Sequence, residues 1–422
     1  MAVAKSVVIL ILLFALASYA DAAPKPRPPV GHDVFGVRKS SKDVLLPGEK
    51  LVNVLSFGAK GDGVTDCTQA FMQTWQAVCK KPGQNRFYVP AGRFLVSEII
   101  FAGPCLAPKP VTIQVVGTIL ATTDISEYAN GRWFEFQDLN GLKMLGGGTF
   151  DGQGQESWKF AEDCKSGNGD TACVPNPPSL YFTKVQNAII MGIKSVNPKG
   201  FHVFVTQCSN IRLQRLRLTA PDTSPNTDGI HISTSYGVKI NRCTIGTGDD
   251  CVGMIDGSEQ IAINKLKCGP GHGISIGSLG RRADEREVKG VRVQNSELIG
   301  TDNGLRIKSF PERFAGGASE IFFTNINMTN VKNPIIIDQE YECDDICKKK
   351  PSLVKIANIH FSNIRGTSAT PMVVDMRCSK MHTCPGVTFN NVDLKFGSAL
   401  TTARCVNVKP VYTGLAKPPI CP

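Results

Sequence analysis

The sequence predicts an all-β fold, a right-handed parallel β-helix built from one stack of coils. Apolar pairs separated by one residue recur roughly every 20–40 residues, which is the interval of a solenoid repeat. Apolar residues at alternate positions indicate strands, and the segments between them show no helical periodicity. Stacked short strands with inward Ile, Val and Leu would fill a narrow core. The pairs begin at Ile211, Val238, Ile261, Val291, Ile321, Ile359 and Val387.

Two other architectures fit the pattern less well. A β-propeller needs four strands and about 40 or more residues per blade, and these repeats are shorter. An α/β fold needs crossover helices, for which the connections lack room. Several repeats also carry an asparagine soon after the apolar pair. These asparagines are Asn295, Asn325, Asn363 and Asn391.

The N-terminal 50 residues are predicted to lie outside the solenoid. Lys5 precedes a short apolar run, Val7–Leu16, and small residues follow up to Ala22, so residues 1–22 are expected to be a secretory signal peptide. The alternative of a membrane anchor is disfavoured because the run is too short to cross a bilayer. Residues 23–50 are rich in Pro and Lys and are interpreted as an arm or propeptide. Residues 51–422 are then a single domain of a secreted chain without a membrane span.

Both ends of a solenoid need covering, because they expose core and strand edges. Thr68 to Val78 has apolar residues at helical spacing, with Asp66 as a possible N-cap, and is predicted to be a short capping helix. The tail from 401 to 422 is predicted to seal the other end. Residues 152–178 lack periodicity and are interpreted as a loop over a cleft.

Fifteen cysteines in an exported chain indicate disulfides, although the odd count leaves at least one thiol over. The local candidate pairs are Cys67–Cys79, Cys164–Cys173, Cys251–Cys268, Cys343–Cys347 and Cys378–Cys384, and the tail adds Cys405 and Cys421. Zinc at Cys343 and Cys347 is disfavoured because no His or Cys pair stands at ligand spacing. Asn327 begins an Asn-Met-Thr sequon, which predicts N-glycosylation.

The formal net charge of +11 suits a nucleic acid, an anionic lipid or an acidic polysaccharide as partner. The chain has no aromatic stacking series and no nucleic-acid-binding module, so nucleic acid is not expected. Most of the lysines are expected to form a solvated surface. We expect a monomer without a cofactor or a bound metal.

Four short motifs carry the chemistry: Asn226-Thr-Asp228, Gly248-Asp249-Asp250, Gly271-His272-Gly273 and Arg306-Ile-Lys308. Alternation after each motif predicts an inward row and an outward row of side chains on neighbouring coils. The inward row is Ile230, Val252, Ile274 and Leu305, and the outward row is His231, Gly253, Ser275 and Arg306. Asp228, Asp250, His272 and Asn303 would then form a column.

Neighbouring coils lie about 4.8 Å apart, so carboxylates on them would be close enough to act together as an acid and a base. Taken singly, an Asp beside Gly is better explained as a turn or cap residue than as a catalytic one. His272, which also stands beside Gly, has the same structural alternative. Three clustered carboxylates raise one another's pKa and leave one protonated. A glycosidic bond needs this division between an acid on the leaving oxygen and a base on water.

In order and separation, the four motifs resemble the signature segments of the polygalacturonases, a family of glycoside hydrolases. The resemblance runs from about Val52 to the C-terminus and implies a pectin-lyase-like parallel β-helix that hydrolyses α-1,4-linked galacturonan with inversion. By position, Asp249 matches the general acid, Asp228 and Asp250 match the pair that activates water, and His272 matches the histidine that supports the acid. Arg306, Lys308, Tyr341 and Asn226 match substrate-binding positions.

Arg306 and Lys308 alternate outward beside the carboxylates, and we expect their charges to be free to bind the carboxylate of galacturonate. Their alternative role is to pair with the Asp cluster and hold it together. The segments 306–311, 337–341 and 378–384 resemble the plant exo-acting, pollen-type branch. Such an enzyme would act on homogalacturonan in the cell wall, outside the cell.

The sequence departs from the family pattern after the Asp pair. Where members of the resembled family usually have Cys, an apolar residue and then Ser, this chain has Cys251-Val-Gly-Met-Ile255, with Gly253 in place of the Ser. Gly253 removes a hydroxyl from the cleft floor, and Ile255 is expected to face outward. The alternatives left open are endo attack, rhamnogalacturonan hydrolysis, a calcium-dependent pectate lyase and a non-catalytic wall-binding protein.

Overall fold

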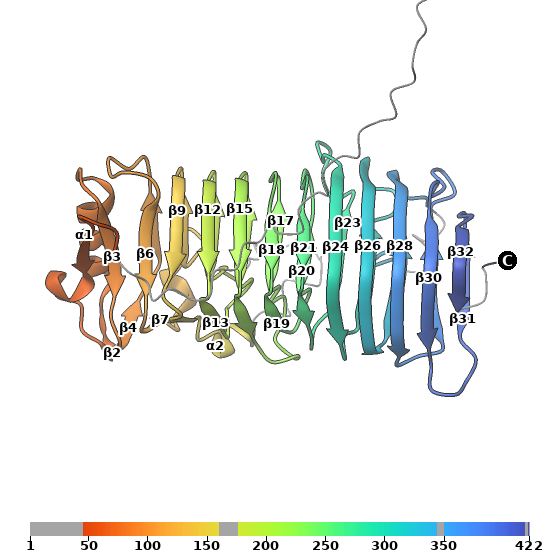
Figure 1. Cartoon of the computed structure of the whole chain (residues 1–422), viewed down its shortest axis with the longest axis horizontal. Coiled ribbons are helices and arrows are strands. Elements are labelled where there is room, and N and C mark those ends of the chain that lie inside the picture. Colours follow the sequence, from red (N-terminus) through yellow and green to blue (C-terminus); the bar gives the residue numbers. More distant parts are fainter. Residues whose placement is uncertain (1–44, 160–175, 344–349, 418–420, 422) are drawn as a thin grey trace, which may run out of the picture. The chain divides into compact units, whose positions relative to one another are not determined.

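The computed structural model describes residues 45–159, 176–343, 350–417 and 421. In this part of the chain nearly all regular structure is parallel β-strand, and each coil pairs with the next (Figure 1). The predicted parallel β-helix is confirmed. The predicted signal peptide and the arm up to Val44 lie outside the described residues, and the first strand begins at Lys50.

One sheet has 11 strands and carries the motif residues. Its strands are β5 (Ile99–Ala102), β8 (Phe134–Gln137), β11 (Leu180–Thr183), β14 (Val203–Thr206), β17 (Ile230–Ser233), β20 (Val252–Met254), β23 (Ile274–Leu279), β25 (Asn303–Ser309), β27 (Asn333–Asp338), β29 (Met372–Arg377) and β31 (Thr402–Val406).

The other sheet has 21 strands and covers two faces of the solenoid, which merge where the long strands β24, β26 and β28 run across both. Its strands are β1 (Lys50–Asn53), β2 (Asp62–Asp66), β3 (Asn85–Val89), β4 (Arg93–Val96), β6 (Val111–Val115), β7 (Thr118–Ala121), β9 (Asn140–Leu145), β10 (Thr149–Asp151), β12 (Gln186–Met191), β13 (Lys194–Val196), β15 (Ser209–Gln214), β16 (Arg217–Thr219), β18 (Lys239–Asn241), β19 (Thr244–Gly246), β21 (Ala262–Asn264), β22 (Lys267–Cys268), β24 (Val288–Ile299), β26 (Gly316–Val331), β28 (Val354–Ser368), β30 (Thr388–Lys395) and β32 (Val411–Lys417).

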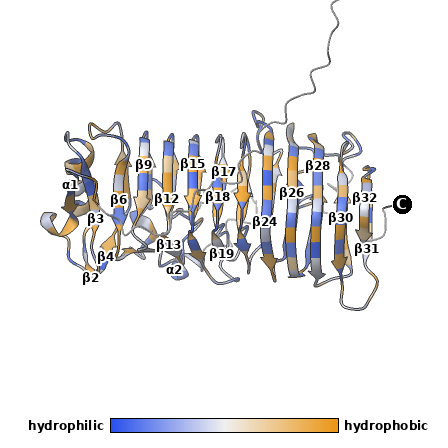
Figure 2. Ribbon diagram, in the orientation of Figure 1, coloured by the Kyte–Doolittle hydropathy of each residue, from blue (hydrophilic) through white to orange (hydrophobic). Residues whose placement is uncertain are grey.

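The core follows the predicted repeat. The second residues of the apolar pairs lie opposite one another from coil to coil, beginning at Leu213 and ending at Phe389. All of them are buried, and Phe323, Phe361 and Phe389 stack at ring-centroid distances of 5.3 and 5.0 Å. Figure 2 shows the matching alternation of hydrophobic and hydrophilic residues along β24, β26 and β28.

The predicted asparagines form a ladder on the outside of the solenoid. The Nδ2 groups of Asn325, Asn363 and Asn391 each donate to the Oδ1 atom of the preceding asparagine, at 3.1, 2.9 and 3.3 Å. The φ angles of Asn295, Asn325, Asn363 and Asn391 lie between 52° and 56°. Asparagine tolerates this left-handed conformation, which turns each coil between faces.

A helix covers the N-terminal end, as predicted. Helix α1 (Thr68–Cys79) packs against β1, β3 and β5, and its Trp75 stacks on Phe101 at 4.6 Å. The expected N-cap is displaced by one position: Cys67 is the cap residue, while the Asp66 carboxylate accepts from the Thr68 N–H at 2.9 Å. The described part also contains α2 (Gln155–Trp158) and two 3-10 helices, Val54–Phe57 and Ile125–Glu127.

Four disulfides lie wholly within the described residues: Cys79–Cys105, Cys251–Cys268, Cys378–Cys384 and Cys405–Cys421. Cys251–Cys268 and Cys378–Cys384 are confirmed, and Cys405–Cys421 joins the two cysteines of the C-terminal tail, but the prediction of Cys67–Cys79 is wrong. These two residues stand at opposite ends of the 12-residue helix α1, about 18 Å apart along its axis, which no disulfide can span. Cys67, Cys208 and Cys243 are buried free thiols.

Two predicted disulfides are not fully covered by the structure. Cys164, Cys173 and Cys347 lie outside the described residues, whereas Cys343 is disulfide-bonded. Among the helices of the described part, none is long and apolar enough to cross a membrane.

Candidate active site

The register of the eleven-stranded sheet brings the four motifs together. Ile230, Val252, Ile274 and Leu305 lie opposite one another on β17, β20, β23 and β25, and all four are buried. The outward row of His231, Gly253, Ser275 and Arg306 is paired in the same way. Asp228, Asp250, His272 and Asn303 each stand two residues before the inward residue of their own coil, so they occupy equivalent positions. The predicted column is confirmed.

The turns that hold the acidic residues are tightly packed. The Gly229 N–H donates to the Asp250 carbonyl at 2.9 Å, and the His272 N–H donates to the Asp249 carbonyl at 2.7 Å. A Cβ at Gly248 would lie 1.9 Å from the Ser224 carbonyl oxygen, so glycine is required before the Asp pair. The side chains of Asp228 and Asp250 are only 6% and 4% exposed, whereas that of Asp249 is 19% exposed.

Asp250 is held by two cations. Its Oδ1 accepts from Ser275 Oγ at 2.6 Å and Arg306 Nη2 at 2.7 Å, and its Oδ2 accepts from Lys308 Nζ at 3.2 Å. The expectation that Arg306 and Lys308 are uncompensated is therefore wrong. Their long side chains reach back across two coils, because a buried carboxylate is strongly destabilising unless it is paired.

The other two substrate-binding candidates are Tyr341 and Asn226. Lys308 Nζ lies 4.9 Å from the centroid of the Tyr341 ring, which also packs on Phe310. The structure therefore places Tyr341 beside the cations. Asn226 is an exposed turn residue with φ of 53°, two residues before Asp228.

Asp249 forms a pair with His272. Nδ1 of His272 lies 3.0 Å from Oδ1 of Asp249, and its Nε2 lies 3.6 Å from Oδ2 of Asp302. The hydrogen bond to Asp249 raises the pKa of His272. Burial acts to raise the pKa of Asp249, but the hydrogen bond and charge of His272 outweigh it and lower this pKa to about 2. In the free site, His272 is thus the protonated member of the pair at acidic pH.

Asp228 has the opposite electrostatic environment. Burial, followed by the charge of Asp249, raises the pKa of Asp228 to about 6, although His231 Nδ1 lies 2.7 Å from its Oδ2 and opposes the shift. Below about pH 6 Asp228 is therefore the protonated carboxyl group of the free site, and above that pH it is ionised. Asp249, matched to the acid by resemblance, is ionised there.

His231 and Ser275 belong to the predicted outward row, but no role was predicted for them. Their positions in that row, next to acidic residues of the column, were the available signal. Gly253 also has a clear consequence: a Cβ there would lie 2.9 Å from Asp228 Oδ2 and 3.1 Å from His231 Nδ1. The absence of a side chain at Gly253 therefore makes room for the Asp228–His231 contact.

A cation is poorly accommodated. Among the described residues, Asp249, Asp250 and His272 offer ligand atoms within 4.8 Å of one another. Both oxygens of Asp250 already bond to Arg306 and Lys308, however, and two positive charges repel a metal ion.

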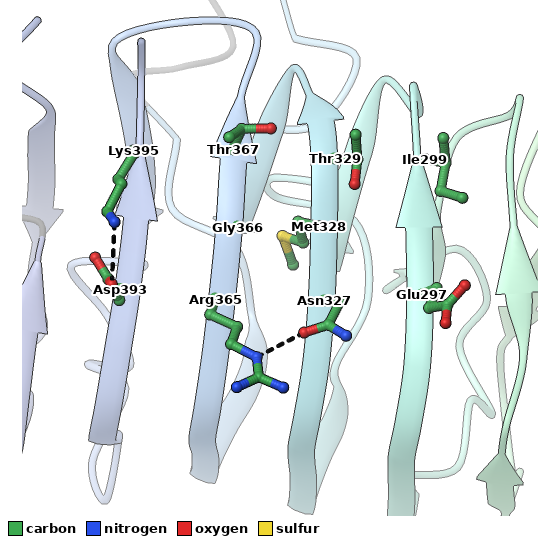
Figure 3. A pocket seen from close by; sticks show the side chains of 10 residues that line it. All are labelled: Glu297, Ile299, Asn327, Met328, Thr329, Arg365, Gly366, Thr367, Asp393 and Lys395. Carbon is green, nitrogen blue, oxygen red and sulfur yellow. Dashed lines mark hydrogen bonds and ion pairs between the residues drawn. The ribbon is translucent and has the colours of Figure 1, made fainter. Parts of the chain in front are cut away.

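A separate groove of about 580 Å³ lies on the twenty-one-stranded sheet (Figure 3). It contains the predicted glycosylation residue, Asn327, which is exposed and whose Oδ1 accepts from Arg365 Nε at 2.8 Å. Asp393 and Lys395 pair with each other there. The groove lacks a carboxylate cluster, so the candidate active site lies on the eleven-stranded sheet.

Comparison with known proteins agrees with this geometry. The model of "Glycosyl hydrolases family 28" matches residues 79–416. The chain belongs to this family. A polygalacturonase of Medicago sativa is 44% identical over 376 residues, covering 88% of this chain and 87% of its own. An exopolygalacturonase of Arabidopsis thaliana is 43% identical over 381 residues, covering 88% and 87%.

Solved structures of family 28 share the fold. The endo-xylogalacturonan hydrolase of Aspergillus tubingensis has a TM-score of 0.76 and 26% identity, covering 85% of this chain and 96% of its own. The exopolygalacturonase of Thermotoga maritima has a TM-score of 0.65 at 21% identity, covering 86% and 92%.

Proposed function

We propose that this family 28 chain hydrolyses α-1,4-glycosidic bonds of polygalacturonan, acting as an exo-enzyme on homogalacturonan outside the cell. The observation that carries the proposal is the cluster of three carboxylates, Asp228, Asp249 and Asp250, beside Arg306 and Lys308. The exo mode is supported by the exopolygalacturonase relative and by the pollen-type segments. Disulfides within the described residues support an extracellular location, and we propose that this location is the cell wall. We further propose that the chain acts as a monomer and that Asn327 is glycosylated.

Asp249 is the proposed general acid, because it is the most exposed of the three carboxyl groups and the leaving oxygen can approach it. In the free site the proton of the Asp249–His272 pair resides on His272. Protonation of Asp249 in the substrate complex would make that proton available to the leaving oxygen. His272 thus supports the acid by keeping a proton beside it, and Asp302 helps to orient the imidazole.

Asp228 and Asp250 are the proposed water-activating pair. A carboxylate has about four acceptor positions, and Asp250 uses three of them for Ser275, Arg306 and Lys308. One position remains for a water O–H. Direct attack of Asp250 on the sugar would disrupt its ion pairs, so water is the favoured nucleophile and inversion the proposed outcome.

The separation of the carboxylates does not by itself decide the stereochemistry. Ligand oxygens of Asp249 and Asp250 lie within 4.8 Å, closer than the roughly 6.5–9.5 Å usual for the two catalytic groups of inverting enzymes. That rule describes two carboxylates, whereas three are present here. Asp228 provides a second position for the water.

Arg306 and Lys308 retain donors for the substrate. Arg306 uses Nε and Nη2 for Ser275 and Asp250, which leaves part of its five-donor fork free. Lys308 uses one of its three N–H groups for Asp250. Both residues therefore hold Asp250 and can also bind a galacturonate carboxylate, with Tyr341 and Asn226 as further contacts.

Time-resolved digestion of homogalacturonan, with product sizes measured from the first minutes, tests this function. Galacturonate monomer from the earliest point indicates exo action, whereas a ladder of oligomers indicates endo action. Activity that a chelator abolishes, with unsaturated products, would identify a calcium-dependent lyase instead. Binding without any product would identify a non-catalytic wall protein.

A further inference from the structure

A row of aromatic side chains lies on the N-terminal side of the carboxylates. Tyr181 on β11 lies opposite Phe204 on β14, which lies opposite His231 on β17, and all three are outward and partly exposed. Phe201, also partly exposed, stands in the turn before β14. These four side chains cover two inter-coil spacings, about 10 Å.

The row is continuous with the candidate active site. The Phe201 and His231 rings stack at 4.4 Å with an interplanar angle of 12°, and the Phe204 ring meets the His231 ring edge-on at 5.1 Å. Tyr181 meets Phe204 edge-on at 5.2 Å. Since His231 Nδ1 contacts Asp228 at 2.7 Å, the aromatic surface begins where the carboxylates end.

The two sides of the carboxylates differ in charge. Arg306 and Lys308 occupy the C-terminal side. On the N-terminal side, the cation that contacts the aromatic row among the described residues is Arg132, which lies 4.3 Å over the Tyr181 ring. Its Nη1 is already paired with Glu135 Oε2 at 3.0 Å. This ion pair is neutral, whereas Arg306 and Lys308 share the single carboxylate of Asp250 and keep a net positive charge, so a sugar carboxylate is attracted less strongly on the N-terminal side.

We propose that Tyr181, Phe201 and Phe204 form a subsite for a sugar unit with an uncharged C6 group, such as methyl-esterified galacturonate, next to the scissile bond. A galacturonate ring has one face composed of C–H groups, which suits an aromatic surface. The C-terminal side then takes a free carboxylate. This inference rests on the proposed hydrolysis. It adds that the site binds an esterified sugar unit on the N-terminal side of the carboxylates and an unesterified one on the C-terminal side.

The first experiment compares hydrolysis of galacturonate trimers with the wild-type protein. One trimer is unesterified, and two others carry a single methyl ester on one or the other sugar flanking the scissile bond. We expect one ester to be tolerated and the ester on the opposite sugar to reduce kcat/KM strongly. Equal loss with either ester would overturn the inference, whereas no hydrolysis of any trimer would reject the proposed function instead.

The second experiment uses Tyr181→Leu and Phe204→Leu, which keep apolar bulk and remove the rings. We expect each to raise KM for the tolerated ester by about 2- to 10-fold. Tyr181→Phe should retain the wild-type KM. Phe322→Leu is the matched control, because Phe322 is a partly exposed phenylalanine on the other sheet that stacks on His360 beneath Arg292.

The outcomes separate binding from structure. An unchanged KM in folded Tyr181→Leu and Phe204→Leu proteins would overturn the subsite. Equal effects in Phe322→Leu would assign the change to general destabilisation and also overturn it. If the leucine variants fail to fold, the asymmetry between the two esters in the wild-type protein decides.

Discussion

Lys308→Met removes one of the two cations that hold Asp250. The Lys308 and Asp250 side chains are 8% and 4% exposed, and their charged atoms lie 3.2 Å apart. Breaking an isolated buried pair costs about 3–5 kcal/mol. Here Arg306 and Ser275 remain bonded to the other oxygen, so we expect a smaller loss of about 1–3 kcal/mol in the free energy of unfolding.

For a domain of this size, such a loss corresponds to a fall in melting temperature of about 1–4 °C, measurable by calorimetry. We also expect a higher KM for galacturonate trimers, because Lys308 contributes to binding the substrate carboxylate. Lys395→Met is the control: its pair with Asp393 spans 3.6 Å, and its side chain is 59% exposed, so the loss should be about 0–1 kcal/mol. A wild-type melting temperature for Lys308→Met would refute the argument that Lys308 stabilises Asp250.

Four further predictions concern the carboxylates. Asp249→Asn should fold and lose about 10²–10⁴-fold in kcat, and wild-type turnover would remove its assignment as acid. His231→Ala removes a contact that lowers the pKa of Asp228, so the acid limb of the kcat/KM profile should move to higher pH; an unmoved limb would exclude Asp228 as its source. The folded-state pKa of Asp228 is raised to about 6, so protonated Asp228 stabilises the folded protein fully below about pH 4, and this contribution is lost as pH rises through 6. Asp228→Asn should abolish this part of the pH dependence of the free energy of unfolding. Gly253→Ala should reduce kcat by displacing Asp228 while leaving the fold intact, and unchanged kcat would contradict the crowding seen at this position.

The fold and the column were predictable because a parallel β-helix repeats its strand register. Once Ile230 and Val252 are aligned by their motifs, the side chains before and after them follow from the period of two. The apolar pairs and the asparagine ladder obey the same rule. These features depend on local alternation, which a sequence displays directly.

The contacts of long side chains were less predictable. Alternation indicates which face Arg306 leaves, but not that its guanidinium bends back to Asp250 across two coils. The failed Cys67–Cys79 pairing has a related cause: the two residues are close in sequence, but helix α1 holds them at its opposite ends. The proton on Asp228 depends on burial and on the position of His272 relative to Asp249, which alternation does not determine.

The central claim is that a water molecule held by Asp228 and Asp250 attacks the sugar while Asp249 protonates the leaving oxygen. The most direct measurement is ¹H NMR of the first-formed product during hydrolysis of an α-1,4-linked galacturonate oligomer, before mutarotation. Attack by water in a single displacement predicts the β anomer at the newly formed reducing end. Early appearance of the α anomer would show a double displacement and contradict the account.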